Sequence, residues 1–80
     1  MNENYFILLG LDCSERDPNK ISEAIKKTMT YWAKMRNHPT KSNYASQVLA
    51  ARSDIEQKMS EKLFLEEESK RCKEIRIKML

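Results

Sequence analysis

The sequence is poor in the residues that tight turns and disulfide frameworks require. It contains one Gly, two Pro and two Cys among 80 residues. Sandwiches and barrels of many strands depend on frequent turns, so this composition disfavours them. Small secreted domains held by disulfides normally carry more cysteines, and Cys13 and Cys72 show no CxxC spacing. We therefore expect two unpaired thiols, either exposed or in the core.

Signals for catalysis are also scarce. His38 is the only histidine, and neither cysteine is close to it in sequence, so nothing marks a Cys–His nucleophile pair or a zinc site. Gly10 is the only glycine, which excludes a Gly-rich phosphate loop. These absences predict a protein without enzymatic activity, cofactor, metal or small-molecule substrate.

No long hydrophobic segment is present. The apolar run at residues 5–11 is too short to cross a membrane, and Glu3 precedes it where a signal peptide would have basic residues. We expect a cytoplasmic protein with no membrane association.

Helical periodicity dominates what the sequence does contain. Apolar residues make up 40% of the chain and charged residues 34%, a profile typical of helices. Asp17-Pro18 is a strong helix start, with Asp as N-cap and Pro at the first helical position. Pro39 disfavours helical geometry at His38 and ends that helix. Apolar or small residues recur at helical spacing between these points, at Ile21, Ala24, Ile25, Thr28, Met29, Trp32 and Met35.

A similar pattern predicts a third helix, which Ser42 or Asn43 would cap. A short first helix is expected over residues 5–9, capped by Asn2 or Asn4 and ended by Gly10. The third helix carries its apolar positions at Tyr44, Ala45, Val48, Leu49, Ala51, Ile55 and Met59.

The predicted fold is all-α. Two helices, at about residues 18–36 and 42–59, form an antiparallel hairpin, with the short N-terminal helix across them and a charged C-terminal helix behind. We expect one helical domain over residues 1–65. Residues 66–80 are predicted to be a charged helical extension or linker, cut from a longer protein.

The net charge of +3 is too small to indicate nucleic-acid binding by itself. Its distribution is uneven, because residues 21–41 hold five basic side chains and one acidic one. Lys20, Lys27 and Lys34 recur every seven residues and share one helix face. Such a stripe is what any amphipathic helix presents to water, and it also fits an acidic partner surface.

Two segments of the chain resemble a known family. Residues 4–11 read Asn-Tyr-Phe-Ile-Leu-Leu-Gly-Leu, similar to the Asp-Tyr-Tyr-x-Ile/Leu-Leu-Gly-Val opening of J-domains. His38-Pro39-Thr40 stands where that family carries His-Pro-Asp. The resemblance covers residues 4 to about 65, and is closest in kind to divergent J-like modules at the N-terminus of larger bacterial proteins. Further matches to the family's second helix are Ile21, Ala24, Ile25 and Trp32.

The resemblance implies a docking role. In J-domains, His-Pro-Asp and the basic face of the second helix bind a DnaK-type chaperone and stimulate its ATPase. Carried over to this chain, the partner-binding residues are Lys27, Lys34, Arg36, His38, Pro39 and Thr40.

Two departures from the family matter. The segment from Ile21 to His38 is longer than in ordinary J-domains. Thr40 replaces the family's Asp, and a hydroxyl cannot replace a carboxylate in a charge-assisted contact with Arg.

These features together predict a non-catalytic protein-interaction module that does not stimulate a DnaK-type ATPase in the ordinary way. One alternative is an active co-chaperone with a variant tripeptide. Another is a basic helical nucleic-acid-binding module, which the modest charge makes the weaker interpretation. We expect a protein partner, with further domains of the same chain beyond Leu80.

Overall fold

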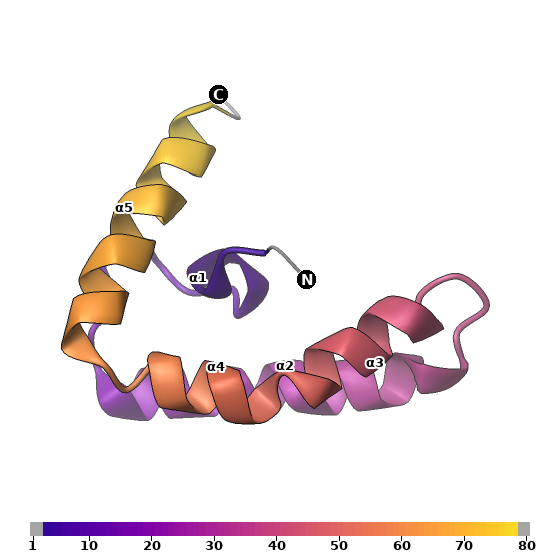
Figure 1. Cartoon of the computed structure of the whole chain (residues 1–80). Coiled ribbons are helices and arrows are strands. Elements are labelled where there is room, and N and C mark those ends of the chain that lie inside the picture. Colours follow the sequence, from indigo (N-terminus) through magenta and orange to yellow (C-terminus); the bar gives the residue numbers. More distant parts are fainter. Residues whose placement is uncertain (1–2, 79–80) are drawn as a thin grey trace.

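The computed structural model describes residues 3–78 and confirms the all-α prediction, since no strand occurs in that range (Figure 1). The elements are α1 (Tyr5–Leu8), α2 (Pro18–Lys34), the 3-10 turn η1 (Met35–Asn37), α3 (Ser42–Ala50), α4 (Arg52–Lys58) and α5 (Lys62–Lys78).

The helices form a flat, angled body. In Figure 1, α2 lies along α3 and α4, which run in the opposite direction, and we call this arrangement the long helix pair. Residues 38–41 join its helices at one end, the loop end, while α5 turns steeply away from the other end. Helix α1 lies in the corner between them and contacts α5. The body measures 34 × 29 × 16 Å.

Local signals set several helix ends as predicted. The Asp17 side chain accepts a hydrogen bond from the Asn19 N–H at 2.9 Å, and Pro18 is the first residue of α2. The Asn4 Oδ1 accepts from the backbone of the second and third residues of α1. Gly10 has a φ of +68°, which permits the chain to leave α1 sharply. Asn2, the other expected cap, lies outside the described residues.

Three boundaries differ from the prediction. Helix α2 ends at Lys34 and tightens into η1. The expected helix over residues 42–59 is divided at Ala51, whose N–H is shared between the carbonyls of Gln47 and Val48 at 3.1 Å each. Neither Ser42 nor Asn43 caps α3, because the N-cap position is Lys41 and no side chain of that position bonds to the helix.

The core is built around α1. Phe6, Val48 and Ile55 are fully buried and bring together one residue each from α1, α3 and α4. Trp32 is partly buried against this cluster, as expected from its place on the apolar face of α2. The other buried members are Leu9, Leu11, Cys13, Ile21, Ile25, Met29, Met59, Leu65 and Cys72.

Helix α5 is packed against the rest of the protein for part of its length. Leu65, Glu68, Ser69 and Cys72 are buried. The boundary expected after residue 65 falls inside this uninterrupted helix. The charged composition of residues 66–74 gave no sign that Glu68 and Ser69 are buried.

The expectation of two unpaired thiols is wrong. Cys13, in the loop before α2, forms a disulfide with Cys72 of α5, and both residues are buried. The partners lie 59 residues apart, so no local spacing marks the pair, and only the packing of α5 brings them together.

Candidate functional site

The His38-Pro39-Thr40 segment forms the turn at the loop end and is held by its own hydrogen bonds. The Nδ1 atom of His38 accepts from the backbone N–H groups of Thr40 and Lys41, each at 3.2 Å. The Thr40 hydroxyl lies 3.3 Å from the same nitrogen. Nδ1 thus acts as the oxygen of an Asn or Asp does in a turn, and it binds N–H groups just before α3. The ring hydrogen then resides on Nε2, which is left for other contacts.

Aromatic side chains join α2 to α3 close to this turn. The rings of Trp32 and Tyr44 are 4.8 Å apart and meet at 62°. Tyr31 packs edge-on against Trp32 at 5.1 Å and is 45% exposed. Burial, with a smaller contribution from Glu3, raises the pKa of Tyr44. The loop end is therefore supported by aromatic packing between α2 and α3.

The half of the long helix pair that includes the loop end is free of acidic residues. No Asp or Glu occurs between Glu23 and Asp54, and every basic residue in this interval is exposed. We call residues 24–53 the cationic half. Its basic residues are Lys26, Lys27, Lys34, Arg36, Lys41 and Arg52.

The expected partner-binding residues all lie within the cationic half. Lys34, Arg36 and residues 38–40 follow one another through the end of α2, η1 and the turn. Lys27 lies about 10 Å further back along α2, because helical residues rise about 1.5 Å each. A shallow depression connects the two lysines on the outer face of α2, and it is lined by Lys26, Lys27, Thr30, Tyr31 and Lys34.

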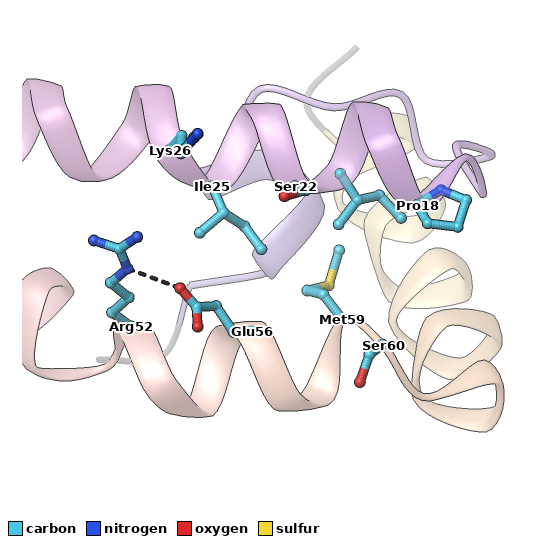
Figure 2. A pocket seen from close by; sticks show the side chains of 9 residues that line it. Pro18, Ser22, Ile25, Lys26, Arg52, Glu56, Met59 and Ser60 are labelled. Carbon is cyan, nitrogen blue, oxygen red and sulfur yellow. Dashed lines mark hydrogen bonds and ion pairs between the residues drawn. The ribbon is translucent and has the colours of Figure 1, made fainter.

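A second surface feature runs from the middle of the long helix pair towards the end opposite the loop. Figure 2 shows a groove between α2 and α4, with Ile25 and Met59 pointing into it and an Arg52–Glu56 ion pair of 2.7 Å at one end. It encloses about 240 Å³. None of the residues predicted for partner binding lines this groove. The sequence did not indicate it because its lining residues come from two helices that are far apart in the chain. The lining is Pro18, Ile21, Ser22, Ile25, Lys26, Arg52, Glu56, Met59 and Ser60.

A polar network at the other side of α1 was also missed. The Tyr5 hydroxyl donates to Asp54 Oδ2 at 2.6 Å, and Lys58 lies 3.4 Å from the same carboxylate. Burial, followed by this hydrogen bond, raises the pKa of Tyr5 to about 12. The hydrogen bond from Tyr5 is the main cause that lowers the pKa of Asp54. The network ties α1 to α4, and its residues are 49 positions apart in sequence.

The described part of the chain contains no group of three His, Cys, Asp or Glu side chains arranged to hold a metal ion. Over residues 3–78, no helix has the length and apolarity needed to cross a bilayer. Comparison with known proteins found no matching family model, no matching curated protein and no matching solved structure.

Proposed function

We propose that this chain is a non-catalytic, J-like protein-interaction module that binds an acidic protein surface through its cationic half. The observation that carries the proposal is the complete lack of carboxylates over residues 24–53, where six basic side chains are exposed. The turn at residues 38–40 stands at the end of this surface. A partner that approaches the loop end therefore meets mainly positive charge, although Glu56 pairs with Arg52 at the far edge of this surface, and such a surface favours an acidic partner over a basic one.

The resemblance to J-domains supplies the candidate partner, a DnaK-type chaperone. Thr40 offers no carboxylate to such a partner, and its backbone and hydroxyl are directed at His38 within the turn. We therefore expect binding without ordinary stimulation of the chaperone's ATPase. Nucleic acid is the weaker candidate partner, because the chain's total charge is low and no base-reading motif accompanies the lysines.

The binding step is tested by calorimetric titration with the DnaK-type chaperone of the same organism. The double variant Lys27→Glu/Lys34→Glu should weaken binding at least about tenfold, because both residues change sign within the proposed contact. Lys70→Glu/Lys73→Glu is the matched control: it makes the same charge change on the exposed surface of α5 and should alter Kd less than about twofold.

Equal weakening by both double variants would mean that only the overall charge of the chain matters. Absence of binding by the native chain would reject the chaperone as partner. Tight binding to duplex DNA with a steep salt dependence would instead support the nucleic-acid alternative.

The ATPase step is tested in a single-turnover assay with the same chaperone. The native chain should give no stimulation, whereas Thr40→Asp should create some. Strong stimulation by the native chain that is lost in His38→Ala would contradict the proposal and support an active co-chaperone.

His38→Asn separates a role of the ring in binding from its role in the turn. Asn offers a side-chain oxygen that accepts the same N–H groups, so the turn should persist without the imidazole. A loss of binding in both His38→Asn and His38→Ala, with unchanged helicity, would assign the contact to the ring itself.

A chaperone of this type as partner places the module in the cytoplasm. The disulfide argues the other way, since such bonds persist mainly in oxidising compartments. In a reducing compartment the chain would be present as the dithiol, so its structure without the Cys13–Cys72 bond bears directly on its function.

A further inference from the structure

The attachment of α5 to the protein depends on two different kinds of contact along its length. Its first turns are anchored by packing: Leu65 is buried, and the Phe64 ring packs against the Tyr5 ring at 5.7 Å with a tilt of 49°. Glu68 adds a hydrogen bond at 2.9 Å from the N–H of Tyr5. None of these contacts involves the disulfide.

From Ser69 onward, α5 forms bonds to one short segment of the chain. The Ser69 hydroxyl donates to the Cys13 carbonyl, and Arg76 donates to the Leu11 carbonyl at 2.9 Å. The Cys13–Cys72 disulfide is the third link between α5 and this segment. Thus the hydrogen bonds and the disulfide that join this part of α5 to other elements all reach residues 11–13, in the loop between α1 and α2.

Beyond the disulfide, packing contributes little. Cys72 is the last buried residue of the part of the chain that the structure describes, and residues 73–78 are all exposed. Ile77, for example, is 70% exposed. A helical segment of about ten residues is marginal in water without tertiary packing. Of the apolar side chains in residues 73–78, only that of Ile75, which is 38% exposed, is more than half covered, so these residues have few apolar contacts to keep them ordered without the covalent link.

We propose that the Cys13–Cys72 disulfide is a redox-sensitive latch. With the bond intact, residues 69–78 of α5 are fixed to the loop before α2. When the bond is reduced, these residues detach and lose helical order, while the long helix pair and the first turns of α5 stay folded. The inference is independent of the proposed partner.

The reduction is an ordinary thiol–disulfide exchange with a dithiol. A thiolate of the dithiol attacks one sulfur of the pair, forms a mixed disulfide and expels the other cysteine as a thiolate, which takes up a proton. The second thiol of the reagent then closes a ring disulfide and releases the remaining cysteine. Two electrons pass from the dithiol to the protein, which ends with two thiols. Cys13 itself is buried but lies between exposed Asp12 and Ser14, so motion of this loop gives the reagent access.

The latch is tested by hydrogen exchange with mass spectrometry on the whole chain, with and without dithiothreitol. In the native chain, reduction should accelerate amide exchange over residues 69–78 by about tenfold or more, whereas exchange over residues 25–32 of α2 should change less than about twofold. The variant Cys13→Ala/Cys72→Ala should resemble the reduced chain, and dithiothreitol should leave its exchange unchanged.

Three results would overturn the latch. Unchanged exchange over residues 69–78 would show that the helix holds without the bond. Loss of amide protection throughout α2 as well would show that the disulfide stabilises the entire fold and not residues 69–78 alone. Two free thiols in the purified, air-oxidised chain, counted by alkylation and mass, would show that the bond does not form.

Discussion

Glu68 is a charged residue buried where α5 meets α1, and its removal should be costly. Its side chain is almost fully enclosed. One carboxylate oxygen accepts the N–H of Tyr5 at 2.9 Å, and the other lies 3.2 Å from Arg71. The carbonyl of the same residue accepts from the Asn4 side chain at 3.0 Å. Glu68 and Asn4 together satisfy the first three N–H groups of α1.

Glu68→Ala leaves the Tyr5 N–H without its acceptor in a partly buried site. A hydrogen bond that involves a charged group contributes about 1.5–3 kcal/mol to stability. We therefore expect the free energy of unfolding to fall by about 2–3 kcal/mol. In a domain of this size each kcal/mol shifts Tm by about 4–8 °C, so Tm should fall by about 10–20 °C.

Thermal unfolding followed by far-ultraviolet circular dichroism, with the disulfide intact, measures the change. Glu67→Ala is the matched control, since Glu67 is the exposed neighbour and lies 3.7 Å from the same Arg71. An exposed pair of this kind is worth at most about 1 kcal/mol, so its loss should shift Tm by only a few degrees. Equal shifts in the two variants would refute the capping role of Glu68.

Three other substitutions test the core, the turn after α1 and the Tyr5–Asp54 contact. Ile55→Ala should reduce the free energy of unfolding by about 2–5 kcal/mol in chemical denaturation, because Ile55 is fully buried. Leu63→Ala is the control: Leu63 is 77% exposed, so its substitution should change the free energy of unfolding by less than about 0.5 kcal/mol. Gly10→Ala should cost about 1–2 kcal/mol in the same assay, because a Cβ at a φ of +68° is strained although the surrounding space is open; an unchanged midpoint would contradict this. Tyr5→Phe should lower Tm at about pH 7, and the Tm difference from the native chain should be smaller at about pH 3. The hydrogen bond from Tyr5 lowers the pKa of Asp54 below its ordinary value of 3.8. Its contribution to stability is therefore present above pH 3.8 and is lost as the Asp54 carboxylate becomes protonated in the folded state. An equal Tm difference at the two pH values would mean that the hydrogen bond does not depend on the Asp54 charge.

Local chemistry accounts for the parts of the fold that the sequence predicted correctly. Asp17-Pro18 and Gly10 set helix ends through contacts and backbone geometry within about one helical turn, so their effects can be predicted without knowledge of distant contacts. The break at Ala51 could not be foreseen, because the residue is a good helix former and its neighbours keep the apolar periodicity.

Long-range pairing explains the larger errors. Glu68 and Cys72 stand in a run of charged residues that is typical of a solvated helix. They are buried only because α1 and residues 11–13 meet α5 there, at sequence separations of more than fifty residues. For the candidate site, the sequence predicted the basic residues and the turn at His38. The internal bonding of that turn depends on side-chain direction, which no spacing reveals.

The cationic half has a kinetic consequence for any encounter. It holds six of the 15 basic residues and none of the acidic ones, so the remainder of the chain carries nine basic and twelve acidic residues. The formal charge is thus +6 in the cationic half and −3 in the remainder of the chain. An approaching acidic surface exerts a torque that turns the loop end towards it before contact, so productive collisions should become more frequent as ionic strength falls. The association rate constant, more than the dissociation rate constant, should then carry the salt dependence of binding.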